Sequence, residues 1–362
     1  MTESPAGSTS SLANDDMDDR AEIALLADHP ELQRVSNALR FCQSAIEPKF
    51  RAADAESLHA QRTYLRYANA AAVSGVLAIL FGIFQMAHLG DAQLENWSPK
   101  YGPWVLPVLE LVSACTTVVV ALAGLGGQKQ QSWFLTRFRA EQLRLLKFHL
   151  LTNPHLWPGD GVVPEKDVRN THDRIDGLTN AAYSDLESWI ARGTVPSVLE
   201  PPPTSEPEWR EIREYYDRNR LQRQIHYFHL RRSKNLHDDQ RTRILPPIFF
   251  FGSVAFVLVH FCIEVAVSGE HGHPMIATIA LVISAALPSL GALIRVTRGV
   301  LEYARNASRC ESTHHALSAL AVRLRDASTA EAAFREIGFA EQVLESDLRE
   351  WLRLMVESEW FG

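Results

Sequence analysis

The sequence has few cysteines, no excess of basic residues and no motif of a known catalytic site. Its four cysteines, Cys42, Cys115, Cys262 and Cys310, form no CxxC pair, so they predict neither a zinc site nor a disulfide framework. The GxxxxGK[ST] phosphate loop, the GxSxG nucleophile turn and the HExxH metal helix are all missing. The net charge of −7 gives no basic surface of the kind that binds nucleic acid. We therefore expect no enzyme activity, no cofactor, no metal site and no nucleic-acid partner.

The first 20 residues also lack the basic and apolar stretches of a signal peptide. They are rich in Ser and Asp, and we expect residues 1–20 to be disordered. A long helix is predicted to follow, interrupted near Pro30 and Pro48 because proline lacks an amide hydrogen. The first apolar span is then expected to direct membrane insertion.

Four long apolar stretches dominate what the sequence does contain. Each has about 20 residues, and a helix of that length matches the ~30 Å hydrocarbon core of a bilayer. Their large side chains lie on all sides of the helix, as contact with lipid requires. We predict spans at about 67–89, 104–127, 244–266 and 274–296. The predicted fold class is an all-α membrane protein with two tandem transmembrane hairpins and long cytoplasmic helices.

Basic residues indicate the orientation of both hairpins. The loop between the first two spans has one Lys and no Arg, and the turn between the last two has neither. Lys and Arg are instead frequent before and after each hairpin. Because basic residues stay on the cytoplasmic side, we expect a multi-pass protein of the cell inner membrane with both termini in the cytoplasm.

A repeated motif divides the chain into two halves. DLESW at 185–189 follows the first hairpin, and DLREW at 347–351 follows the second. Leu and Trp of each motif share a helix face, which favours helix packing over a docking surface for a partner. The predicted organisation is a disordered start at 1–20, a first two-span unit at 21–200, a Pro-rich linker at 201–207 and a second two-span unit at 208–362.

The segment before the second hairpin carries a family resemblance. It reads WREIREYYDRNRLQRQIHYF and contains Trp209, Tyr215, Arg218, Leu221, Gln224 and Tyr227. With the short-turn hairpin and the DLREW helix, it resembles the SLATT domains, two-span modules of bacterial conflict systems associated with nucleotide signalling. The first half, with RFRAEQLRLLKFHL and DLESW, resembles a more divergent copy. The resemblance implies a pore-forming or membrane-perturbing effector in anti-phage defence. No nucleotide-binding domain is fused to this chain, so a nucleotide-sensing or nucleotide-synthesising partner would supply the signal.

Two polar stripes are candidates for the lining of a pore. In the second span, Glu110, Ser113 and Thr117 recur at spacings of three and four, and in the third span His260 and Glu264 share a face. A carboxylate within a span is costly and is a functional candidate by default. Glu110 also lies near the expected outer surface, where the cost is lower, so pore lining and interfacial placement stay equal alternatives.

Two other patterns concern helix packing. Ser74, Ala78 and Gly82 form a small-residue ridge on the first span, typical of close helix contact. Pro288 and Gly291 interrupt the fourth span, where they predict a kink and are candidates for a hinge. A static kink is the favoured reading.

The preferred functional interpretation is a membrane effector that oligomerises to form or gate a pore, because four spans from one chain are too few to enclose a wide conduit. The expected partners are the lipid bilayer and further copies of the chain. The first alternative is a non-conducting scaffold or signalling protein whose cytoplasmic helices recruit partners. The second is a small-solute transporter, which the sequence favours less because no span is broken by charges at its middle. A half-chain ending near Pro201 is expected to insert as a hairpin without full activity.

Overall fold

The computed structural model describes residues 15–90, 102–125, 128–157, 165–193, 204–267 and 275–357. Within these ranges the chain forms helices and turns and no strand. The predicted all-α class is therefore confirmed, while the arrangement of membrane spans stays a prediction. The predicted disordered start lies outside the described residues as far as residue 14. Its last residues differ from the prediction, because Asp15–Met17 form a short helical turn and Asp16 and Asp19 are buried.

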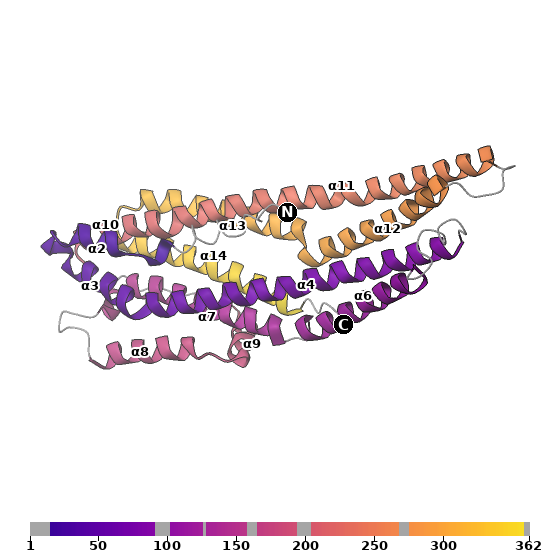
Figure 1. Cartoon of the computed structure of the whole chain (residues 1–362). Helices are drawn as coiled ribbons and strands as arrows, with labels where there is room; N and C mark the ends of the chain where they lie inside the picture. Colours follow the sequence, from indigo (N-terminus) through magenta and orange to yellow (C-terminus); the bar gives the residue numbers. More distant parts are fainter. Residues whose placement is uncertain are drawn as a thin grey trace. The chain divides into compact units, whose positions relative to one another are not determined.

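Each half of the chain contains a long helix, an apolar helix and further shorter helices (Figure 1). The first half comprises η1 Asp15–Met17, α2 Arg20–Leu26, η2 Pro30–Leu32, α3 Gln33–Phe41, η3 Cys42–Ile46, α4 Glu47–Gly90, α6 Gly102–Leu125, α7 Gln128–Leu151, η4 Pro154–Leu156, α8 Glu165–Thr179 and α9 Tyr183–Arg192. The second half comprises α10 Glu206–Tyr216, η5 Asp217–Leu221, α11 Gln222–Val267, α12 Met275–Leu301, α13 Tyr303–Asp326 and α14 Ala330–Glu357.

The two halves share one order of elements. In both, a short helix leads through a five-residue π-helical turn into a long helix, and an apolar helix and a 24-residue helix follow. Around Pro48 the helix is therefore continuous through η3, where the sequence predicts an interruption. Proline does not explain the π turn, since η5 is followed by Arg223 at the equivalent position. Each turn ends on a buried apolar residue, Ile46 or Leu221, which points to packing as the shared cause.

Local sequence explains where the central helices begin and end. Glu208 accepts a hydrogen bond from the backbone amide of Ser205 at 2.7 Å, which forms a capping box at the start of α10. Asp185 does the same for Ala182 at the start of α9. Gly193 follows α9 with φ of 72°, a conformation that glycine adopts without steric cost.

The residues divide into two compact units, and each unit contains parts of both halves. Unit 1 comprises residues 1–61, 131–234 and 305–362, and unit 2 comprises 62–130 and 235–304. The predicted linker at 201–207 therefore separates the repeats along the chain, and it does not separate the compact units.

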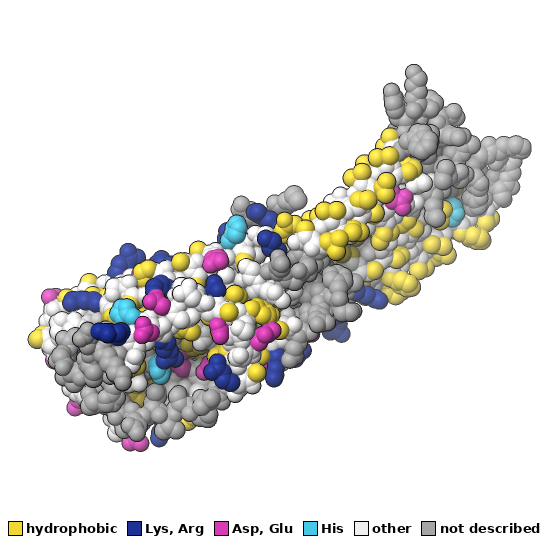
Figure 2. Space-filling view, turned by 90° about the horizontal axis from the view of Figure 1, so that it is seen from below, with side chains coloured by type: hydrophobic (Ala, Val, Ile, Leu, Met, Phe, Trp, Pro, Cys, Tyr) yellow, Lys and Arg dark blue, Asp and Glu magenta, His cyan; other side chains and the backbone are white. Residues whose placement is uncertain are grey.

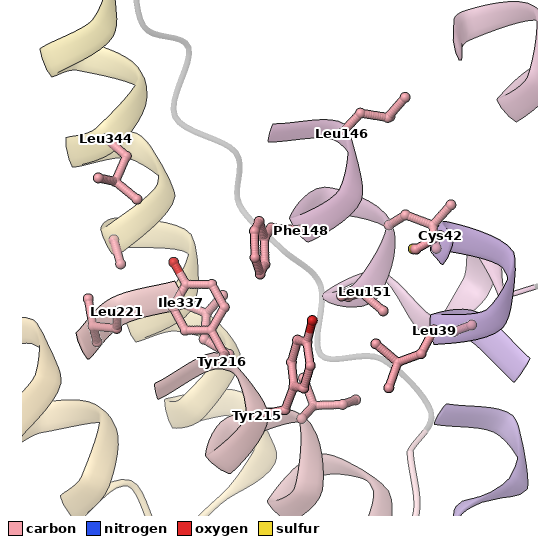
Figure 3. Close-up of a cluster of buried hydrophobic side chains, with 14 of the residues drawn as sticks. Leu39, Cys42, Leu146, Phe148, Leu151, Tyr215, Tyr216, Leu221, Ile337 and Leu344 are labelled. Carbon is pink, nitrogen blue, oxygen red and sulfur yellow. The ribbon is translucent and has the colours of Figure 1, made fainter. Parts of the chain in front are cut away.

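Unit 1 has a hydrophobic core built from helices of both halves. Phe148 of α7 lies beside Tyr216 of α10 (Figure 3), with ring centroids 5.8 Å apart in an edge-to-face arrangement. Leu39 and Cys42 approach from the N-terminal helices, and Ile337 approaches from α14. All five side chains are at most 1% exposed, so this core depends on segments far apart in the sequence.

Unit 2 exposes apolar side chains along its helices. Leu111 and Leu122 of α6 are 63% and 73% exposed, and Phe251 and Phe261 of α11 are 69% and 63% exposed. Figure 2 shows such side chains covering the surface of these helices with few charges among them. Two helical stretches, Pro30–Gln85 and Glu206–Ile263, are long and apolar enough to cross a membrane, and in each only 6% of the most apolar window is buried. Two apolar helices are shorter, Val105–Val120 and Ile279–Arg295.

Candidate functional site

The candidate residues of the first two predicted spans meet each other between α4 and α6 of unit 2, which lie side by side (Figure 1). Thr117 donates a hydrogen bond from Oγ1 to Ser74 Oγ at 2.9 Å, and Ser74 in turn donates to the Ala70 carbonyl at 2.7 Å. Two turns further along α4, an ideal Cβ built on Gly82 would lie 3.2 Å from Glu110 Oε1. Gly82 thus leaves the space in which the Glu110 carboxyl lies.

This geometry places Glu110 and Thr117 against a neighbouring helix of the same chain. Ser113 and Ala78 are half-buried on the same two helices. His260 is half-buried on α11, and the side chain of Glu264 lies outside the described residues. Pore lining therefore stays a prediction for all five candidates, which are Glu110, Ser113, Thr117, His260 and Glu264.

The second helix pair, α11 and α12, has a similar contact pattern. Ser253 donates from Oγ to the Ser284 carbonyl at 2.6 Å. Seven residues earlier on α11, the backbone of Pro246 lies beside Gly291, whose ideal Cβ would be 3.6 Å from the Pro246 carbonyl oxygen. Gly291 is buried in this contact, while Pro288 is exposed and α12 continues through it. Gly291 of the candidate hinge is thus a point of close contact between α12 and α11.

In both pairs the helices run antiparallel, and their contacts recur every two turns. From Gly75 to Gly82 on α4, the neighbour changes from Thr117 to Glu110 on α6. A seven-residue step on one helix with an equal and opposite step on its partner is the spacing of left-handed helix packing. The second pair repeats it, since Pro246 and Ser253 on α11 meet Gly291 and Ser284 on α12.

A second group of chemically active residues, which the sequence did not predict, lies in the core of unit 1. Lys147 of α7 is completely buried, and its ammonium lies 2.9 Å from Asp19. Tyr215 also donates a hydrogen bond to this Asp19 carboxylate. Arg144 and Arg220, both at most 3% exposed, approach the two oxygens of Asp16 at 3.4 and 3.0 Å. The segment 15–19 therefore supplies two carboxylates to three buried cations.

Carboxylates of other helices complete this network. Arg220 also pairs with Glu341 of α14 at 3.1 Å, and Arg144 pairs with Glu141 at 3.0 Å. Burial opposes ionisation of Glu141, but Arg137 and Arg144 outweigh it and lower the pKa of this carboxyl. Burial raises the pKa of Asp19, and Lys147 and Tyr215 oppose that shift. Buried pairs of this kind specify an arrangement more than they add stability, so the network fixes how segment 15–19, α7 and the second half meet.

The two DLxxW motifs meet on one aromatic cluster in unit 1. Trp189 packs on Phe138 with centroids 5.4 Å apart, and Trp351 lies 6.1 Å from Trp133. The guanidinium of Arg349 lies over the Trp189 ring at 4.4 Å. The favoured interpretation of these motifs, helix packing, is therefore confirmed.

The sequence held one signal for the buried network. Lys147 lies four residues after Leu143 and three before Leu150, so it occupies the same apolar helix face. Leu143 and Leu150 are both fully buried. A charged residue within such a face predicts a buried partner. The sequence does not identify that partner, because Asp19 is 128 residues away.

Comparison of the chain with family models, with curated proteins and with solved structures found no match. The resemblance to SLATT domains therefore rests on the sequence patterns alone and stays a prediction.

Proposed function

We propose that the chain is a multi-pass protein of the cell inner membrane, with four spans in two helix pairs and both termini in the cytoplasm. The observation that carries this proposal is the apolar exterior of unit 2, where side chains such as Leu122 and Phe251 are about two-thirds exposed or more. Exposed apolar surface of this extent is unfavourable in water and is expected in lipid. The distribution of Lys and Arg around the hairpins supports the orientation.

Cysteine labelling tests this topology. In a cysteine-free background, single cysteines at Gln93 and Gly272 should react with an impermeant thiol reagent in intact cells, because both loops are expected outside. Cysteines at Asp160 and Ser346 should react only after the cells are opened. Labelling of Asp160 from outside would contradict the proposal.

Within the membrane, the proposed role is that of an effector that oligomerises to form or gate a pore, or otherwise perturbs the bilayer, in a bacterial anti-phage response. The SLATT resemblance supports this role, and so does a carboxylate, Glu110, on an otherwise apolar helix. Because Glu110 is half-buried and its carboxyl lies beside Gly82 of α4 in the single chain, full exposure to a pore would require α4 and α6 to rotate or separate. Conduction is therefore proposed for an activated assembly, with a nucleotide-sensing or nucleotide-synthesising protein as its partner.

Reversal potentials in planar bilayers under a KCl gradient test the pore. The assembly should prefer cations, since charges about 4 Å apart interact by roughly 4 kcal/mol at an effective dielectric of 20. The double variant Glu110→Gln, Glu264→Gln should reduce this preference. Unchanged selectivity would assign both residues to packing or surface roles.

The alternative function is a non-conducting scaffold. One observation favours it, namely that within the helix pair Thr117 donates a hydrogen bond to Ser74 and the Glu110 carboxyl lies beside Gly82. Full insertion and oligomer formation without conductance or loss of membrane potential would support the scaffold over the pore. A small-solute transporter is the third possibility, and solute uptake by proteoliposomes without channel conductance would support it.

A further inference from the structure

Unit 1 contains a cavity of about 200 Å³ between helices of both halves. Its wall is formed by α4 and α7 from the first half and by η5, α11, α13 and α14 from the second. Five arginines and two carboxylates line it. Apolar side chains such as Trp133, Phe228 and Leu344 make up the rest of the lining. The core of a helix bundle is ordinarily filled by apolar side chains, so the charged part of this wall calls for a chemical explanation.

Most of the lining arginines are neutralised by carboxylates. Arg137 pairs with Glu141, and Arg144 and Arg220 share Asp16. Arg309 pairs with Asp347 at 3.2 Å. These pairs hold the wall in place, and their charges are largely cancelled within it.

Arg231 is the exception among the arginines that line the cavity. No carboxylate lies within ion-pair distance of it in the part of the chain that the structure describes. Its neighbour Arg232, which does not line the cavity, pairs with Glu311 at 2.8 Å. Burial raises the pKa of the Cys310 thiol, and both Arg309 and Arg231 act against this shift, so the two guanidiniums approach the same part of the wall. Arg231 is thus the lining arginine whose guanidinium makes no ion pair with a described carboxylate.

One further polar group at the cavity makes no hydrogen bond with the described residues, namely the side-chain amide of Gln224, a residue that is only 6% exposed. Gln224 and Arg231 are seven residues apart and therefore lie on the same face of α11. Polar groups in such surroundings are normally paired, so the donors of Gln224 and Arg231 are suited to a ligand that accepts hydrogen bonds.

We propose that this cavity binds a small organic molecule that carries a phosphate group. A phosphate monoester supplies three acceptor oxygens and a charge of about −1.5 to −2, and arginine binds it through a planar fork of donors. A carboxylate supplies two oxygens and a single charge, so it offers fewer acceptors and less charge to Arg231 and Gln224. Trp133, Tyr227 and Trp351 line the same cavity and offer faces on which a ring can stack. For scale, a cavity of about 150 Å³ holds benzene.

Isothermal titration of the purified full chain in detergent with phenyl phosphate tests the site. Phenyl phosphate should bind, and benzoate, which has the same ring with a carboxylate, should bind at least about tenfold more weakly. Arg231→Gln should weaken phenyl phosphate binding by about tenfold or more, while the adjacent Arg232→Gln should leave it unchanged. Arg231 is half-buried at the wall, and circular dichroism of each variant verifies that it folds.

A competition experiment then shows whether the bound phosphate group belongs to a lipid or to a soluble molecule. Nanodiscs with phosphatidic acid, a lipid whose headgroup is a phosphate monoester, would indicate a lipid headgroup if they compete with phenyl phosphate, and competition by soluble glycerol phosphate alone would indicate a free metabolite. Either result supports the site. Absence of phenyl phosphate binding, or binding that is equal in wild type and Arg231→Gln, would overturn the proposal and leave a cavity that holds water.

Discussion

Lys147 places a positive charge in the core of unit 1, where the carboxylate of Asp19 is its ion-pair partner. Its ammonium lies 2.9 Å from Asp19. Removal of one partner from a buried ion pair leaves an uncompensated charge and costs about 3–5 kcal/mol. We predict that Asp19→Leu lowers the free energy of unfolding of unit 1 by about that amount, as measured by thermal and chemical unfolding of the full chain in detergent.

Two variants serve as controls for this prediction. Asp18→Asn removes a neighbouring carboxylate whose partner, Arg20, is 72% exposed, and it should change stability little because surface pairs contribute little. The double variant Asp19→Leu, Lys147→Met removes both charges and should recover much of the loss. If the double variant is as unstable as Asp19→Leu alone, the network is not the cause.

Two histidines in unit 1 make stability depend on pH. Burial and the nearby Arg174 lower the pKa of His149, and burial with His229 and His315 lowers the pKa of His314. The unfolded chain therefore takes up protons near the usual histidine pKa of about 6.5 before the folded chain does, so protonation favours unfolding. We predict a melting temperature that falls as pH decreases from about 7.5 to about 5.5. His149→Gln with His314→Gln should flatten this profile, and an unchanged slope would assign it to other groups.

At the scale of helices, the close approach of α4 and α6 is predicted to depend on the small size of Gly82. Even a Cβ there would lie 3.2 Å from the Glu110 carboxyl oxygen, so the larger side chain of leucine should displace Glu110 or push the helices apart. In a cysteine-free background, Ser74→Cys with Thr117→Cys should form a disulfide on oxidation, since the two hydroxyl oxygens are 2.9 Å apart. Adding Gly82→Leu should reduce this cross-link severalfold.

The matched control for the cross-linking experiment is Gly177→Leu in α8. An ideal Cβ on Gly177 meets nothing within 4 Å, so this variant should leave the cross-link unchanged. Equal cross-linking in the Gly82→Leu variant would show that the helices approach each other in a different register.

The sequence predicted helices better than it predicted their interruptions. The four apolar stretches are helical in α4, α6, α11 and α12 over all their described residues, because long apolar runs with few charges leave little alternative to a helix. The continuous passage through η3 near Pro48 was not predicted, since π turns depend on packing and the equivalent turn η5 has no proline beside it. The ridge at Ser74 and Gly82 was visible from spacing, but its neighbours on α6 required the pairing of two helices.

At the scale of the whole molecule, the repeat indicates the order of the elements, and it does not indicate which of them pack together. The sequence divides the chain at 201–207 into two successive two-span units, and both compact units of the structure contain parts of each half. The reason is physical: α7 of the first half buries Phe148 against Tyr216 of the second, and Asp16 meets Arg220, 204 residues away. Contacts of that separation leave no periodic pattern in a single sequence.

This shared core predicts the behaviour of the separated halves. A chain of residues 1–200 would lose Arg220 opposite Asp16, Tyr215 beside Asp19 and Tyr216 against Phe148. We predict that residues 1–200 alone fail to form a stable unit 1, because buried charges and apolar surface would both be exposed to water.

Limited proteolysis after membrane extraction should cut α7 in this half-chain, while α7 stays protected in the full chain. Co-expression with residues 201–362 should restore protection, since the contacts need both halves but no covalent link between them. Equal protection of α7 in residues 1–200 alone would mean that each repeat folds independently, and the ion network would then have no role in joining the two halves.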